Sequence, residues 1–101
     1  MSNLEIYEAR IARGHVLKVL KTAYPEPASV ELLEIALNDR HCPTSPAVIQ
    51  GYAQYLADKG YVTVSEVGNE ELGLYRFLVK LTPKGIDLLE GTIPKDPGVV
   101  L

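Results

Sequence analysis

The sequence predicts a single α+β domain in which three helices precede a two-stranded β-hairpin and a final helix. Apolar residues recur at intervals of three and four along the first half of the chain, as on one face of a helix. Beyond Gly60 the pattern changes to an alternation of apolar and polar residues, which is typical of strands. Serine or threonine stands at the expected start of three helices, where its hydroxyl can accept a free backbone amide.

The first helix is predicted over residues 5–23, and two prolines in the segment YPEPAS end it. Its apolar face carries Ala9, Ala12, Val16, Leu20 and Ala23. Its other side carries four cations, Arg10, Arg13, Lys18 and Lys21. These cations form either a patch that faces phosphates or the water-facing side of an amphipathic helix.

The next two helices are predicted on either side of the connection DRHCP. The earlier helix has Ser29 as its N-cap and ends near Asn38. Its buried stripe is predicted to be Leu32, Leu33, Ala36 and Leu37. The later helix is capped by Thr44 or Ser45 and ends at Gly60, which suits a left-handed backbone. Its inward face is formed by Ile49, Ala53 and Leu56, with Tyr52 beside them.

Two strands are predicted at residues 61–67 and 74–81, joined by the loop GNEELG. In the second strand, one face carries Tyr75, Phe77, Val79 and Leu81, and the other carries Arg76, Leu78 and Lys80. The final helix has Thr82 as its cap and Pro83 at its first position, and it ends at Gly91.

The domain is therefore predicted to cover residues 1–91, followed by an extended tail over residues 92–101. The tail ends in the apolar segment GVVL, whose exposure is unfavourable by roughly 25 cal/mol per Å². We expect this tail to pack back on the domain or across a dimer partner. The alternative is a frayed terminus.

Composition limits the chemistry of this chain. The net charge of −3 and a pI near 5.3 argue against holding nucleic acid by bulk electrostatics. Cys42 is the one cysteine, and His15 and His41 add too few ligands for zinc, so neither a metal nor a cofactor is expected. The sequence has no nucleophile elbow and no phosphate-binding glycine loop, so an enzyme is not expected. An acidic N-terminus and the lack of an apolar run of roughly 20 residues predict a cytoplasmic protein without membrane contact.

The segments YLADKGYVTV and VKLTPKGIDLL resemble the winged helix-turn-helix pattern of bacterial and phage regulators. That family has an apolar residue four positions before a helix-ending glycine, and its second strand often runs into a Leu-Thr-x-x-Gly helix start. The matching positions are Leu56, Gly60, Leu81, Thr82 and Gly85, and the resemblance covers roughly residues 9–91. In size and in its Thr-Pro-Lys-Gly segment, the chain also resembles small winged-helix proteins of Mu-like prophages.

The resemblance implies that the outward face of the third helix enters the major groove and that the wing touches the adjacent backbone. The base-contact candidates are Ser45, Ala47, Gln50, Gln54 and Tyr55. The phosphate-contact candidates are Arg13, Arg76 and Lys80. Glutamine can pair bidentately with adenine, and tyrosine can donate to a phosphate. The implied function is a small non-enzymatic regulator that binds double-stranded DNA, as a homodimer on two half-sites.

The wing departs from the pattern of DNA-binding family members, which commonly place cations there. The wing carries Glu66, Glu70 and Glu71, and within the wing no cation precedes Arg76. Carboxylates repel phosphates, and missing cations remove counterion release as a source of affinity. The alternative function is therefore a winged-helix module in which the acidic wing or the tail binds another protein and no nucleic acid. In that case the outward glutamines are a solvated helix face.

Overall fold

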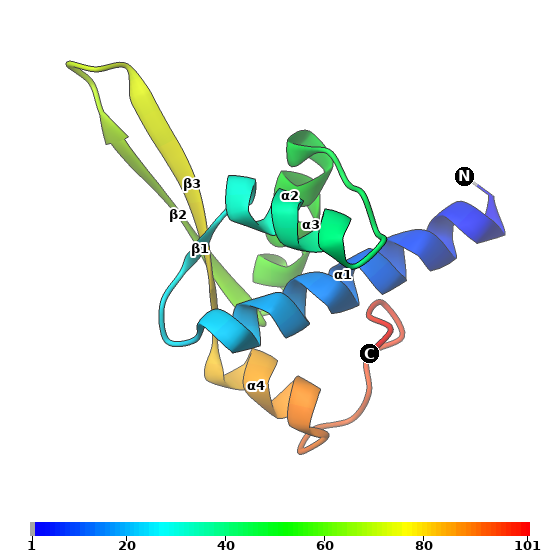
Figure 1. The fold of residues 1–101 in the computed structure, drawn as a ribbon. Coiled ribbons are helices and arrows are strands. Elements are labelled where there is room, and N and C mark those ends of the chain that lie inside the picture. The colour runs from blue at the N-terminus through cyan, green and yellow to red at the C-terminus, as the bar shows by residue number, and fades with distance from the viewer. Residues whose placement is uncertain (1) are drawn as a thin grey trace.

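The computed structural model describes residues 2–101, which form four helices and one small sheet (Figure 1). The helices are α1 (Asn3–Ala23), α2 (Val30–Asp39), α3 (Pro46–Asp58) and α4 (Pro83–Glu90). The strands are β1 (Ala28–Ser29), β2 (Val62–Asn69) and β3 (Leu74–Leu81). In Figure 1 the β2–β3 hairpin extends away from the helices as a long wing. The predicted α+β class and the predicted order of helices and hairpin are confirmed.

The sheet has the strand order β1-β3-β2, and all neighbouring strands are antiparallel. The wing strands keep one register, in which Val64 lies opposite Val79. The third strand, β1, was not predicted: Ala28 pairs with Val79, and Ser29 pairs with Leu78. Two residues show no alternating pattern, so only their tertiary pairing makes them a strand. The expected two-stranded ribbon is therefore a three-stranded sheet.

One hydrophobic core joins all four helices to the sheet. The predicted inward residues of α3, Ile49, Ala53 and Leu56, have no exposed surface, so α3 is seated against this core. The prediction for α2 is wrong at Leu32, whose side chain is half exposed. Val30 takes the buried place instead, because residues 30, 33 and 37 lie on one face of the helix.

Hydroxyl caps fix the starts of three helices as expected. The hydroxyls of Ser29, Ser45 and Thr82 accept backbone amides in the first turns of α2, α3 and α4 at 3.1, 3.4 and 3.1 Å. The cap of α3 is thus Ser45, while Thr44 donates to a loop carbonyl at 2.9 Å. After α3 ends, Gly60 follows with a positive φ of 83°, a conformation that glycine adopts readily.

The tail, residues 92–101, packs back on the domain. Val99 belongs to the core, and the backbone amide of Val100 donates to the carbonyl of Arg10 in α1 at 3.0 Å. Gly14 is buried beneath this contact. A larger residue would not fit there, because a Cβ at position 14 would overlap the carbonyl oxygen of Val100. Figure 1 shows the C-terminus beside α1. Of the two expected outcomes for the tail, the structure shows packing on its own domain.

Candidate nucleic-acid interface

The outward face of α3 is open to solvent. Ala47, Gln50, Gly51 and Gln54 are all exposed, and apart from the adjoining helix backbone and the two neighbouring residues no atom lies within 4 Å of the place that a Cβ on Gly51 would take. Ser45 is exposed at the N-terminal end of this face. Because Ala47 and Gly51 are small, another surface can approach the helix backbone closely beside the two glutamine amides, which project from the same face. Four of the five predicted base-contact candidates are therefore accessible together, namely Ser45, Ala47, Gln50 and Gln54.

Gln54 is held by a neighbour that the sequence analysis did not include. Its Nε2 donates to Oδ1 of Asp58, one helical turn later, at 2.9 Å. The spacing of four residues on a helix is the signal that could have revealed this pair. The exposed Asp58 carboxylate orients the amide, and it also places a negative charge on the face that would meet phosphates.

Tyr55 and Arg13 lie together, apart from the glutamine face. The guanidinium carbon of Arg13 is 4.0 Å from the centroid of the Tyr55 ring. The ring is partly buried against the core, and a Cβ on Gly98 of the tail would overlap the Tyr55 hydroxyl. Tyr55 was expected on the exposed outward face, but it is only partly exposed and lies to the side of the glutamines, because five residues after Gln50 a helical position has rotated by roughly 140°. Arg13, a predicted phosphate contact, is engaged by this aromatic ring.

Asp96 attaches the tail to the end of α3. Its carboxylate accepts hydrogen bonds from Nζ of Lys59 at 3.0 and 3.1 Å, from the Tyr61 hydroxyl at 2.7 Å, and from the amide of Gly98 at 2.8 Å. Its side chain is only 8% exposed. No local pattern predicts this cluster, because Asp96 and Tyr61 are 35 residues apart in the chain.

The hydrogen bonds of this cluster control its ionisation. Burial alone would raise the pKa of Asp96, but donors from Tyr61, Gly98 and Lys59 outweigh burial and lower the pKa below its ordinary value. Burial, together with the hydrogen bond to Asp96, raises the pKa of Tyr61 to about 12. Asp96 is therefore ionised at neutral pH, and it neutralises the cation that follows α3.

The wing brings two predicted phosphate contacts to one face of β3. Arg76 and Lys80 are both exposed, and their spacing of four residues puts them on the same side of the strand. The paired register places Thr63 and Val67 of β2 on this face as well, opposite Lys80 and Arg76. The alternation predicted along the second strand, which puts Arg76 and Lys80 on one face, is thus observed.

The wing also exposes carboxylates and apolar side chains. Glu66, Glu70 and Glu71 are all exposed, as predicted for a docking element or a solvated tip. Apolar side chains accompany them at high exposure, namely Val67, Leu72, Leu74 and Tyr75. At the tip, Oδ1 of Asn69 accepts the backbone amides of Glu71 and Leu72 at 3.0 and 3.3 Å, which holds the turn in place.

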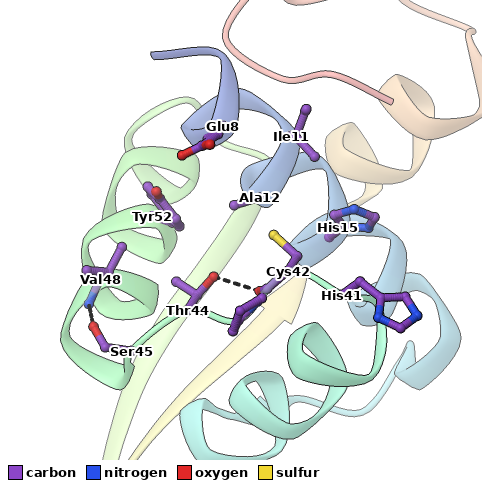
Figure 2. Close-up of a pocket in the computed structure, with 11 residues that line it drawn as sticks. Glu8, Ile11, Ala12, His15, His41, Cys42, Thr44, Ser45, Val48 and Tyr52 are labelled. Carbon is purple, nitrogen blue, oxygen red and sulfur yellow. Dashed lines mark hydrogen bonds between the residues drawn. The ribbon is translucent and has the colours of Figure 1, made fainter. Parts of the chain in front are cut away.

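A hollow of about 550 Å³ separates α1 from the start of α3 (Figure 2). Tyr52 lines it from α3, Cys42 from the connecting loop, and His15 from α1. Arg40 donates to Nδ1 of His15 at 3.1 Å. Burial, then the charges of Arg40 and Lys18, lower the pKa of His15, so this imidazole is neutral at pH 7.

Residues 2–101 contain no group of three or more His, Cys, Asp or Glu side chains placed to hold a metal ion. Over the same described range, every helix is too short or too polar to cross a membrane.

Comparison with known proteins shows similarity in fold to a solved structure. No protein-family model and no curated protein matches the chain. A solved structure that does match is a PadR-like transcription factor from Bacteroides fragilis, with a TM-score of 0.62 and 18% sequence identity. The match covers 79% of this chain and 78% of that chain. This likeness, together with the helix order and the wing, shows that the chain has a winged helix-turn-helix fold of the kind found in transcription regulators.

Proposed function

We propose that the chain is a small DNA-binding protein of the transcription-regulator type, in which α3 enters the major groove. The observation that carries the proposal is the open outward face of α3, where Gln50 and Gln54 stand one turn apart beside Ala47 and Gly51. The major groove admits an α-helix, and small residues between longer polar ones let those polar side chains reach base edges. The similarity in fold to a transcription factor supports this class of function.

The two glutamines supply the chemistry of base recognition. Each amide offers a donor and an acceptor, and it can pair bidentately with N6 and N7 of adenine. Gln54 would exchange its hydrogen bond with Asp58 for one with a base. Ala47 would contact a thymine methyl group. The exposed Ser45 hydroxyl and the backbone amide of Ala47 at the start of α3 would contact a phosphate, since Pro46 has no N–H and the amide of Val48 donates to Ser45.

Arg76 and Lys80 would contact phosphates from the outer face of the wing. Each neutralised phosphate contributes roughly −0.9 to the slope of log K against log salt, so two contacts predict a slope of about −2 per chain. Binding to arbitrary DNA should therefore be weak, and base contacts should account for a large share of specific affinity.

Titration against mixed-sequence duplex DNA tests this function. We expect association at about 50 mM salt that weakens with the slope above as salt rises. Arg76→Ala together with Lys80→Ala should flatten the slope. The matched control is Lys21→Ala on α1, a cation that lies 3.9 Å from Glu90 and should not change it. Absence of association at low salt would contradict the proposal.

A second function is favoured by one observation, the exposed apolar and acidic wing. Leu72, Leu74 and Tyr75 are each more than half exposed beside Glu70 and Glu71. Exposed apolar side chains next to charged ones are typical of protein-binding surfaces. In this function the chain is a protein-interaction module whose partner has an apolar surface with a basic rim. The duplex titration separates the two, because this module would not associate with DNA at any salt concentration.

The DNA-binding proposal includes a homodimer that reads two half-sites about one helical turn, roughly 34 Å, apart. It also includes the narrower class of phage-type regulators, which is supported by the likeness of the segment LTPKG to small prophage proteins. The genes encoded beside this one would test that class: neighbours from a prophage would support it, and neighbours of ordinary metabolism would count against it.

A further inference from the structure

The first half of α1 carries an apolar stripe that the rest of the chain leaves exposed. Leu4 is 66% exposed and Tyr7 is 52% exposed, and Ile11 continues the same line. Positions 4, 7 and 11 fall on one face of a helix. Figure 1 shows these turns extending past α2, α3 and the sheet. Leu4 and Tyr7 therefore contribute little to the core of their own domain.

The stripe borders the hollow between α1 and α3. Ile11 belongs to both, and Val48 and Tyr52 line the hollow from the α3 side. Val48 is itself 43% exposed. Figure 2 shows Ala12 between the two helices, with Tyr52 on one side of it. One molecule thus presents both a projecting apolar helix and a recess of about 550 Å³ beside it, which is the pairing that an isologous interface needs.

Charges along α1 are separated in a way that favours an antiparallel copy of the same helix. Glu8 precedes Ile11 on the exposed side, and Lys18 follows it on that side. Arg40 adds a guanidinium next to His15 at the Lys18 end. When two such helices pack antiparallel with Ile11 of each copy beside His15 of the other, the helical spacing brings the two charged positions together. Glu8 of each copy then lies opposite Lys18 of the other. A parallel arrangement would place like charges together.

We propose that a second copy of this chain covers the stripe, with the two α1 helices packed antiparallel and Ile11 of each copy directed toward the other copy's hollow. This inference rests on the proposed DNA-binding function in one respect: the second copy is the one that would bind the second half-site. The contact itself forms without DNA. Each copy would keep its α3 face and its wing free.

Sedimentation equilibrium without DNA, over a micromolar concentration series, tests the interface. We expect twice the chain mass of 11.1 kDa for the unaltered protein. Leu4→Glu combined with Tyr7→Glu should raise the dimer dissociation constant roughly tenfold or more, because charges replace the apolar stripe. Circular dichroism should stay unchanged, since both side chains are exposed. The matched control is Leu72→Glu on the wing, where the side chain is 68% exposed and the dimer should persist.

A charge exchange distinguishes a second copy from any other partner. Glu8→Lys and Lys18→Glu should each weaken the dimer, and the two changes in one chain should restore it, because each altered residue then meets its opposite again. A single-chain mass throughout the series would overturn the proposal. So would a dimer that the Leu4 and Tyr7 changes leave intact, or a double exchange no stronger than the single changes. Loss of DNA binding by an intact dimer would count only against the proposed function.

Discussion

Asp96 is the residue on which the position of the tail depends. Its buried carboxylate joins Lys59 at the end of α3, Tyr61 before β2 and Gly98 in the tail. Asp96→Asn keeps the shape but removes the charge that these donors stabilise, so the free energy of unfolding should fall by about 2 kcal/mol. Urea denaturation at pH 7 measures this. The same change at exposed Asp39 should have almost no effect, and equal losses at the two positions would contradict the role of the cluster.

The same cluster predicts how stability depends on pH. The pKa of Asp96 is lowered by folding, so its contribution is present above the unfolded value of 3.8 and is lost as pH falls further toward the lower folded pKa. The pKa of Tyr61 is raised to about 12, so its contribution is present below 10 and is lost as pH rises through 12. Unfolding measured across pH should show both losses in the unaltered protein. In Asp96→Asn, persistence of the full acid loss would exclude this carboxylate as its source.

Replacing each of two helical glycines by alanine should change the stability of the fold in opposite directions. A Cβ at Gly14 would overlap the carbonyl oxygen of Val100, so Gly14→Ala should displace the tail and lower the melting temperature. Gly51 has no atom near its Cβ position, so Gly51→Ala should stabilise α3 by about 1 kcal/mol. Thermal unfolding of both variants checks this, and a stabilised Gly14→Ala variant would show that the tail does not lie where described.

At the scale of elements, α3 combines a buried face with the open face that we propose meets DNA, and on that proposal Asp58 lowers the affinity. Asp58→Asn keeps an oxygen that can accept from Gln54 but removes a charge that repels phosphates. We expect affinity for duplex DNA to rise by roughly 1 kcal/mol, about fivefold. Fluorescence anisotropy at low salt measures the change. Asp87→Asn on α4 is the matched control, and an equal rise in both variants would mean that only net charge matters.

Local rules predicted most elements, because their signals lie close together in the chain. The caps Ser29 and Thr82 and the alternation along β3 depend on neighbouring residues, and each was found where expected. The strand β1 was missed because two residues hold no period, and their pairing partner lies some fifty positions away in β3. Leu32 was misplaced because an apolar residue beside a buried stripe was taken for part of it.

The candidate site was predicted in part for the same reason. Helical spacing placed Ala47, Gln50 and Gln54 on an open face, and the structure agrees. The same spacing turns Tyr55 away from the glutamines, and the sequence could not show that the tail around Gly98 packs against this side of α3 in the folded chain. The Asp96 cluster could not be anticipated, since its members meet across the whole length of the domain.

At the scale of the whole molecule, the fold and the charge lead to different expectations. A winged helix-turn-helix domain with an open third helix suits a DNA groove, whereas a net charge of −3 and an acidic wing oppose DNA. DNA binding is compatible with this negative charge if the affinity comes from base contacts and from two copies bound side by side, with few phosphate contacts per chain. The central claim is therefore that the glutamine face of α3 reads sequence.

Selection of binding sites from a pool of random duplexes tests that claim most directly. The unaltered protein should enrich a short motif with adenines at defined positions, repeated about one helical turn apart. Gln50→Ala together with Gln54→Ala should lose preference at those positions, with each lost pair costing roughly 1–3 kcal/mol, while weak binding to unrelated DNA remains. A pool that shows no enrichment, or a motif that the double variant selects equally well, would contradict the account.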